Sequence, residues 1–424
     1  MKMIRFRDVF KDKNFSLLWC AQVVSNFGDR LNQMALVALV YQRSPGNAVA
    51  LAKLIALTII PVFLIGPIAG AWVDRLNRRN VMIICDILRG FLVLLIPFFI
   101  KTNQILPIYL IVFLTFSISR FFIPSKMAII PELVSREKLL VANTLSDTTH
   151  MIGNVVGLVV AGIIVNIPSI GAVGGFYIDA TSFFISAAFI GMIVQREFIR
   201  HVRDDFEVTR EALEDSIRKS IVTEIKEGIG YLTKYGNMRF IVNAFFLLMA
   251  GIGAISCVII VFIQDAFDTP TRDLGFLGMF LVIGLFLGTL LYGKFGQGLK
   301  KRMIVYASFT ATGISIALFT FSVKGWPDIL LSGPLAALIG IAVSPMMTSM
   351  NTLTHETVPE EARGRIFSSL EAVMHLAFLV FMFAAAYAVK HTGSFWVLTG
   401  TGMLFLVYGV SGVLYENRTR TTYP

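Results

Sequence analysis

Six ionisable side chains inside long apolar runs are the residues of this sequence best suited to chemistry. They are Asp29, Arg30, Arg120, Asp147, Glu371 and His375. A charged group at bilayer depth costs at least about 2.5–3.5 kcal/mol on insertion scales. Each of the six therefore predicts a partner, a water-filled cavity or a function. Carboxylates together with a histidine point to the uptake and release of protons.

Asp29 and Arg30 are neighbours in the middle of the first apolar run. Successive helical side chains project about 100° apart, so these two cannot simply neutralise each other across one helix face. We expect at least one of them to face a central cavity. A carboxylate partly removed from water can take up a proton near neutral pH, which favours a proton-coupling or substrate-binding role for Asp29. The alternative is a structural ion pair with Arg30 or Arg120.

Asp147 and His375 occupy matching positions, 228 residues apart, in two similar parts of the chain. Histidine titrates closest to physiological pH, so an acid and a histidine brought near one axis would make a proton-responsive pair. Glu371 precedes His375 by one helical turn. Its alternative role is that of a capping or latch residue near a helix end.

The remaining buried charges are expected to be structural. Asp86 and Arg89, at i and i+3, predict a local ion pair. His150 and Asp179 are expected to be interior polar groups whose hydrogen bonds are satisfied.

Composition defines the class of protein. Hydrophobic residues make up 56% of the 424 and charged residues only 15%, against roughly 25% charged in soluble domains. The net charge of +10 does not indicate nucleic-acid binding, because the basic residues form no patch interleaved with aromatic residues. The three cysteines lie in apolar runs without a CxxC pair, which predicts neither a disulfide nor a metal site.

We predict an all-α integral membrane protein with twelve transmembrane helices, since about 20 apolar residues cross a bilayer. The predicted spans are 14–41, 48–73, 79–100, 104–124, 137–166, 171–195, 238–265, 273–295, 300–322, 326–354, 363–389 and 393–416. Of the 37 lysines and arginines, 27 lie at the N-terminus or in loops after even-numbered helices. Positive charge accumulates in cytoplasmic loops, so both termini are predicted to be cytoplasmic.

The chain is expected to divide into two six-helix halves. A polar segment at 196–237 separates a bundle at 1–195 from a second at 238–424. Isoleucines at helical spacing within that segment predict an amphipathic helix, placed on the cytoplasmic membrane face or against the underside of the bundle. Two matches between the halves, at offsets of 223 and 228 residues, indicate duplicated halves with a substrate site between them.

The loop at residues 70–79 is the strongest local motif. It reads Gly70-Ala-Trp-Val-Asp-Arg-Leu-Asn-Arg-Arg79, and its charged residues are Asp74, Arg75, Arg78 and Arg79. A second copy at 293–302 is less complete, with Gln297 in place of Asp74. We expect Asp74 to pair with Arg78 and to lie against the positive N-terminal end of the eleventh helix, near Gly364 and Arg365. Arg120 is a candidate for the same charge network.

The 70–79 loop resembles the signature loop of the major facilitator superfamily. Further motifs resemble its third drug:proton antiporter family, which includes macrolide-efflux and siderophore-export proteins. These motifs are Asn14-Phe-Ser-Leu-Leu-Trp19, Ser25-Asn-Phe-Gly-Asp29, Pro131-Glu-Leu-Val134 and Arg363-Gly-Arg-Ile-Phe-Ser368. The resemblance covers almost the whole chain. It implies proton-coupled export of an amphipathic small molecule across the inner membrane of a bacterium by a monomer in contact with lipid.

A second resemblance implies a different activity. Phe27-Gly28-Asp29, Ile123-Pro-Ser-Lys-Met-Ala-Ile-Ile-Pro-Glu132 and Val141-Ala-Asn143 are similar to bacterial lysophospholipid transporters, which flip an amphiphile inward. The Gly364-Arg365 motif favours export. A non-transporting membrane sensor is a third alternative. No HExxH, GxSxG or P-loop pattern occurs, so we expect neither an enzyme nor a bound cofactor, and no use of ATP.

Overall fold

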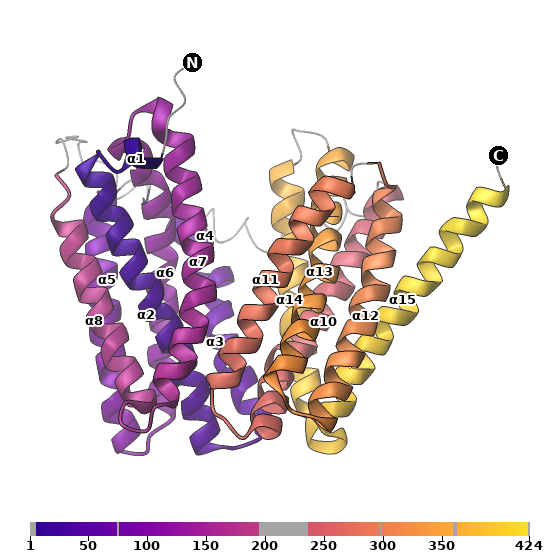
Figure 1. Ribbon diagram of the computed structural model, residues 1–424. Coiled ribbons are helices and arrows are strands. Elements are labelled where there is room, and N and C mark those ends of the chain that lie inside the picture. Colours follow the sequence, from indigo (N-terminus) through magenta and orange to yellow (C-terminus); the bar gives the residue numbers. More distant parts are fainter. Residues whose placement is uncertain (1–5, 74–75, 195–235, 297, 359–362, 423–424) are drawn as a thin grey trace. The chain divides into compact units, whose positions relative to one another are not determined.

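The computed structural model describes residues 6–73, 76–194, 236–296, 298–358 and 363–422, and every regular element in these ranges is a helix (Figure 1). In chain order the elements are α1 (Phe6–Val9), α2 (Lys13–Arg43), α3 (Ala48–Leu64), α4 (Gly66–Val73), α5 (Arg78–Lys101), α6 (Leu106–Leu133), the 3-10 turn η1 (Arg136–Lys138), α7 (Leu139–Asn166), α8 (Gly171–Gly191), α10 (Gly236–Phe267), α11 (Arg272–Phe295), α12 (Lys301–Gly325), α13 (Ile329–Thr357), α14 (Arg363–Thr392) and α15 (Ser394–Thr422).

Ten of the described helices are long and apolar enough to cross a membrane, and α3 is a shorter apolar helix. The prediction of a multi-pass membrane protein is confirmed at this level. α2 has the length to span a bilayer, at 31 residues, but it carries too many polar residues to stand among the ten. Its polarity comes from the residues of the candidate site described below.

The predicted span at 48–73 is interrupted in the structure. α3 ends at Leu64 and α4 begins at Gly66, so two helices replace the continuous one that the apolar run predicts. Pro67 explains the break, because proline has no backbone N–H to donate and disfavours helical geometry at the residue before it. α4 therefore starts anew, with Pro67 in its first turn, where a missing donor costs least.

The chain separates into two compact units. Unit 1 comprises Met1–Leu39 and Lys53–Arg218, and unit 2 comprises Val40–Ala52 and Lys219–Pro424. The predicted linker at 196–237, with its amphipathic helix, lies outside the described residues except for the first two residues of α10. The predicted division at residues 195 and 238 remains a prediction.

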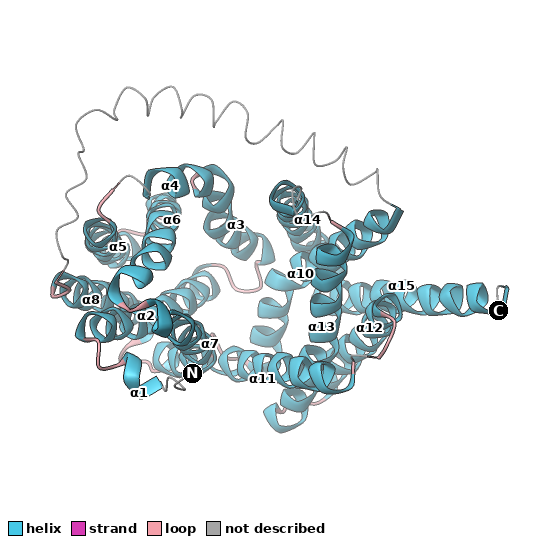
Figure 2. Cartoon of the chain, turned by 90° about the horizontal axis from the view of Figure 1, so that it is seen from above, coloured by secondary structure: helices cyan, strands magenta, loops and turns pink. Residues whose placement is uncertain are grey.

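Within unit 1, α5 is the central element: it packs against both α6 and α8 (Figure 2). α4 packs on α6, and α7 packs on α8. A buried apolar cluster joins α1, α2, α5, α6, α7 and α8, with Phe15, Met82 and Ile129 at most 1% exposed. This cluster holds the helices that carry the polar residues of the site.

Unit 2 repeats this packing plan. α12 packs against α13 and α15 as α5 packs against α6 and α8, and α11 packs on α13 as α4 packs on α6. Small residues permit the closest approach: a Cβ at Gly340 of α13 would lie 2.6 Å from the backbone nitrogen of Leu285 in α11. Two units with one packing plan agree with the duplication that the sequence predicts.

Candidate functional site

A stripe of polar residues runs along α2, the most polar of the long apolar helices. Its members are Gln22, Ser25, Asn26, Asp29 and Asn32. The last four follow Gln22 by 3, 4, 7 and 10 residues, spacings that keep side chains on one side of a helix. Gln22, Ser25 and Asn32 are at most 7% exposed. Polar groups buried this deeply need hydrogen-bond partners, so the partners of the stripe define the site.

At one end of the stripe, Gln22 joins α2 to α7 by a reciprocal pair of hydrogen bonds. Gln22 Nε2 donates to the backbone oxygen of Ser146 at 3.0 Å, and Ser146 Oγ donates to Gln22 Oε1 at 2.7 Å. Trp19 Nε1 adds a bond to Thr149 Oγ1 at 2.8 Å. These contacts fix the rotation of α2 against α7, and therefore the direction in which the rest of the stripe points.

Further along, Asn32 joins α2 to α8. Its Nδ2 donates to Asp179 Oδ2 at 2.6 Å. Asp179 is fully buried, and its other carboxylate oxygen has no hydrogen-bond partner among the described residues. The expectation that Asp179 is a satisfied interior group is therefore wrong for one of its two oxygens. His150, expected in the interior, is exposed on α7.

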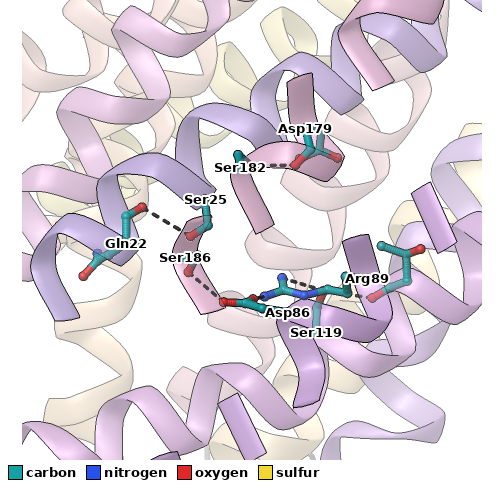
Figure 3. Close-up of polar contacts among 9 residues, drawn as sticks. Gln22, Ser25, Asp86, Arg89, Ser119, Asp179, Ser182 and Ser186 are labelled. Atoms are coloured by element: carbon teal, nitrogen blue, oxygen red, sulfur yellow. Dashed lines mark hydrogen bonds and ion pairs between the residues drawn. The ribbon is translucent and has the colours of Figure 1, made fainter. Parts of the chain in front are cut away.

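Asp86 and Arg89 form the predicted ion pair, and it is buried. Both lie on α5, with side chains 0% and 4% exposed. Ser186 Oγ of α8 donates to Asp86 Oδ2 at 2.7 Å, and Arg89 donates to Ser119 Oγ of α6 at 3.3 Å (Figure 3). The Arg89 guanidinium also lies over the rings of Phe122 and Phe183, at 4.6 and 4.3 Å. Every partner comes from the same bundle, so the pair ties α5, α6 and α8 together.

Asp29 and Arg30 do not pair with each other. Arg30 donates to Gln33 Oε1 at 2.6 Å, and its Nε has no partner among the described residues. The Arg30 side chain packs against α7 where Gly157 leaves room, since a Cβ at Gly157 would lie 2.7 Å from Arg30 Cγ. Asp29 is half-buried and forms no ion pair within the described part of the chain. The charged groups around it are Arg89, Arg30 and His150.

Arg120 and Asp147 lie on separate helices of unit 1. Arg120 is half-buried on α6, and its Nε has no partner among described residues, which leave out Asp74 and Arg75. Asp147 is exposed on α7, and it interacts electrostatically with Lys126 of α6 and His150 of its own helix. The role of Arg120 in a loop network and the role of Asp147 in a proton-responsive pair both stay predictions.

Glu371 and His375 lie on α14 of unit 2. Glu371 is exposed, and His375 Nδ1 lies 2.9 Å from the backbone oxygen of Glu371, one turn earlier. Nδ1 donates to that carbonyl when it carries a proton, which is so in the Nδ1–H neutral tautomer and in the charged imidazole. The helix backbone thus orients the imidazole.

Eight of the ten residues of the 70–79 loop are described, all but 74 and 75. Asn77 caps α5 by accepting a bond from the backbone nitrogen of Asn80 at 3.1 Å, which places Arg78 and Arg79 in the first turn. Arg78 forms an ion pair with Glu132 and donates to the backbone oxygen of Ala128 at 3.0 Å, both on α6. Arg79 donates to the backbone oxygen of Ile190 at 3.1 Å, at the end of α8.

Most of the other residues of the predicted latch cannot be placed from the described part of the chain. Asp74 and Arg75 lie outside the described residues, as does the side chain of Arg365. Gly364 lies in the first turn of α14, and Gly70 falls in α4. The pairing of Asp74 with Arg78 is untested. The two arginines are already bound to the ends of α6 and α8, so the loop is anchored on unit 1 whichever partner Asp74 takes.

The described residues contain no group of three or more histidine, cysteine, aspartate or glutamate side chains suited to a metal ion. The arrangement in unit 1 is instead a chain of carboxylates, guanidinium groups and amides inside an apolar helical bundle. Groups of this kind can bind polar solutes and exchange protons. Because placing them in a bilayer costs free energy, their presence indicates a functional site.

Long apolar helices, two units with one packing plan and ionisable groups within the helices define a multi-pass membrane transporter. Residues 8–419 match the profile of the MFS_3 family, described as transmembrane secretion effector. The chain belongs to this family of the major facilitator superfamily. Its relatives are transporters, and it is not an enzyme.

Curated relatives support an exporter. The chain is 24% identical over 421 residues to macrolide efflux protein A of Streptococcus pyogenes, covering 95% of this chain and 96% of the relative. It is 25% identical over 377 residues to the uncharacterized MFS-type transporter YkuC of Bacillus subtilis, covering 87% and 84%. A solved bacterial homologue of the iron transporter ferroportin, in its inward-facing state, has a TM-score of 0.69 at 14% identity, covering 94% and 98%. That likeness concerns the fold alone.

Proposed function

We propose that this protein exports an amphipathic small molecule, of the drug, macrolide or siderophore class, in exchange for protons by alternating access. The single observation that carries the proposal is the environment of the Asp29 carboxylate. A half-buried carboxylate on the polar stripe of α2 forms no ion pair among the described residues, although two arginines lie nearby.

The two neighbouring arginines have other partners, which supports this role for Asp29. Arg30 is bonded to Gln33, and Arg89 is held by Asp86 and two aromatic rings. Neither is locked to Asp29 as in a static ion pair. A carboxylate in this setting can gain and lose a proton as its access to water changes, which is what a coupling residue must do.

The substrate class rests on the relatives and on composition. Macrolide efflux protein A is similar to this chain over nearly its whole length. The 36 phenylalanines and 17 methionines suit a cavity with deformable apolar walls. An amphipathic solute would combine apolar contact with such walls and a polar contact with the α2 stripe.

The 70–79 loop is proposed as the moving latch. In one state Asp74 would pair with Arg78 and lie near the positive end of α14, beside Gly364 and Arg365. Each contact would contribute about 0.3–2 kcal/mol. Contacts this weak would stabilise one conformational state only slightly, so the protein could still leave it. Substrate and protons would shift the equilibrium between the two states if each binds one state more tightly than the other. Asp147, Glu371 and His375 are proposed to respond to protons in the same cycle.

The topology proposed for this function has twelve crossings. The ten apolar spans, the pair α3–α4 and the polar α2 supply them. Both termini would be cytoplasmic, because lysines and arginines gather on that side. We propose a monomer in the inner membrane of a bacterium.

Transport into inside-out proteoliposomes tests the proposal. The probe is a radiolabelled macrolide, and an interior acidic by about one pH unit supplies the driving force, worth about 1.4 kcal/mol per proton. We expect accumulation that collapses with a protonophore and that is lost in Asp29→Asn. Macrolide accumulation that ignores both the gradient and this substitution would contradict proton coupling.

A parallel assay with spin-labelled lysophospholipid addresses the alternative activity. Inward flipping of this amphiphile without a pH gradient, combined with no transport of the macrolide, would replace export by lipid flipping. Binding of either probe without any movement across the membrane would instead support the sensor alternative.

A further inference from the structure

Asp179 of α8 is a deeply buried carboxyl group near the polar stripe that forms no ion pair among the described residues. Its side chain is fully buried. Asn32 Nδ2 donates to Oδ2 at 2.6 Å, while Oδ1 has no partner among the described residues. Ser182, one turn along, donates its Oγ hydrogen to the backbone oxygen of Asp179 at 2.8 Å and lies close enough to act on the carboxyl group as well (Figure 3). The groups that donate to this carboxyl among the described residues are thus neutral, an amide and a hydroxyl, and neither supplies a counter-charge.

Gly28 of α2 closes the other side of the carboxylate. A Cβ at Gly28 would overlap Ser182 Oγ and would lie 2.5 Å from Asp179 Oδ1. The unpartnered oxygen therefore faces the bare backbone of α2. A Cα–H group is a weak donor worth far less than an N–H, so this contact does not balance a full negative charge.

The nearby cations are committed elsewhere. The charged groups acting on Asp179 are Asp29 of α2 and Arg89 of α5. Arg89 is paired with Asp86 and lies against Phe122 and Phe183. Arg30 is bonded to Gln33.

The charges therefore do not balance. Three carboxyl groups, on Asp29, Asp86 and Asp179, lie near two guanidinium groups, those of Arg30 and Arg89. α7, which also packs on α8, carries Asp147 and His150, and His150 acts on Asp29. A buried ion without a counter-ion is very costly and is neutralised instead. One of the three carboxyl groups must hold a proton, and Asp179 is the one without an ion pair and without exposure.

Unpartnered amides next to the carboxylates provide a route for that proton. Asn26 Nδ2, Asn32 Oδ1 and Asn154 Oδ1 are buried without a partner among the described residues. Asn32 bonds to Asp179 of α8, and Asn26 lies beside Gly153 of α7. Buried polar atoms that find no protein partner are normally bonded to ordered water. Water at these amides would extend the hydrogen bonding along α2 toward Asn32, the residue that donates to Asp179.

We propose that Asp179 is a second proton-carrying carboxyl group of the transport cycle, protonated in the structure described and able to exchange its proton through Asn32 and Asp29. Loss of the proton leaves a carboxylate that competes with Asp86 for Arg89. Loss of the proton from Asp179 would thereby change the packing of α2 and α8 on α5. This assignment rests on the proposed proton-coupled export.

The test compares Asp179→Asn with wild type in the macrolide assay and in counterflow, which needs no gradient. Asparagine has the shape of the protonated acid but cannot release a proton. We expect gradient-driven accumulation to fall to the level seen with protonophore, while counterflow and macrolide binding persist. Ser182→Ala is the matched control: it removes a neighbouring polar atom of α8 without removing a titratable group, and it should keep gradient-driven transport.

The outcomes separate the two proposals. A wild-type protein indifferent to the gradient defeats the proposed function. If transport is driven by the gradient in the wild type and equally in Asp179→Asn, the proposed role of Asp179 is wrong while the proposed function stands. Infrared spectroscopy gives a second readout: the band of a protonated carboxyl group should be present in the wild-type protein at neutral pH and should shift on adding macrolide. Absence of that band overturns the assignment even if Asp179→Asn fails to fold.

Discussion

Arg78 and Glu132 form an ion pair that joins the first turn of α5 to the last turn of α6. Lys301 and Glu356 form the equivalent pair, at 2.5 Å, between the first turn of α12 and the last turn of α13. Lys301 follows Arg78 by 223 residues, and Glu356 follows Glu132 by 224. Each unit thus closes the same two helix ends with one cation and one carboxylate.

These two pairs should contribute small and similar amounts to stability. Their side chains are 26–55% exposed, and pairs exposed to this degree contribute about 0.2–1 kcal/mol. Double-mutant cycles on thermal unfolding in detergent, with Arg78→Gln and Glu132→Gln, and with Lys301→Gln and Glu356→Gln, measure each coupling. Arg78→Gln should cost more than Glu132→Gln, because Arg78 also holds the Ala128 carbonyl. Zero coupling in both units would show that the pairs do not act as clamps.

The buried pair of Asp86 and Arg89 should matter far more. Removing one member leaves an uncompensated charge in the bundle, which costs about 3–5 kcal/mol. We expect Asp86→Asn and Arg89→Met each to lower the midpoint of unfolding strongly, and the double variant Asp86→Leu with Arg89→Met to recover much of the loss. Single variants as stable as wild type would mean that water, not the partner, satisfies these charges.

The contrast between these pairs shows what the sequence could predict. Asp86 and Arg89 lie one turn apart on one helix, so spacing alone predicts their pairing. Arg78 and Glu132 are 54 residues apart, and nothing local distinguishes Glu132 from other carboxylates near helix ends. The helices themselves follow from apolar runs of bilayer length, apart from the break that Pro67 introduces in 48–73.

The candidate site was only partly predictable for the same reason. Asp29 and Arg30 are conspicuous as adjacent charges in an apolar run, and the i, i+1 geometry correctly argues against a direct pair. Asn32 and Ser186 are less conspicuous, because a single amide or hydroxyl in an apolar helix usually bonds its own backbone. The period of the α2 stripe from Gln22 to Asn32 was the available signal, and it predicts the buried side of that helix but not its partner on α8.

The two copies of the loop motif should contribute unequally to transport. The first copy carries Asp74, and the second carries Gln297 at the matching position. If the first copy alone is a complete latch, Asp74→Asn should slow turnover far more than Gln297→Ala. Macrolide binding by thermal shift should be retained in both, because the loop is distant in sequence from the α2 stripe. Initial rates of counterflow measure turnover, and equal rates for the two variants would remove the asymmetry.

Gly28 sets how closely α2 approaches α8, and its substitution should be destabilising. A Cβ there would overlap Ser182 Oγ and crowd Asp179 Oδ1, and overpacking of this kind costs about 1–3 kcal/mol. We expect Gly28→Ala to lower the thermal midpoint, and the pair Gly28→Ala with Ser182→Gly to recover most of it by moving the space to the facing helix.

Gly153 provides the matched control for this prediction. A Cβ at Gly153 would lie 3.8 Å from Asn26 Cβ, an ordinary contact. Alanine favours helix over glycine by up to about 1 kcal/mol, so Gly153→Ala should be neutral or stabilising. If Gly28→Ala is as stable as Gly153→Ala, α2 and α8 do not approach as closely as described. In that case Asp179 Oδ1 has room for a partner other than its own proton.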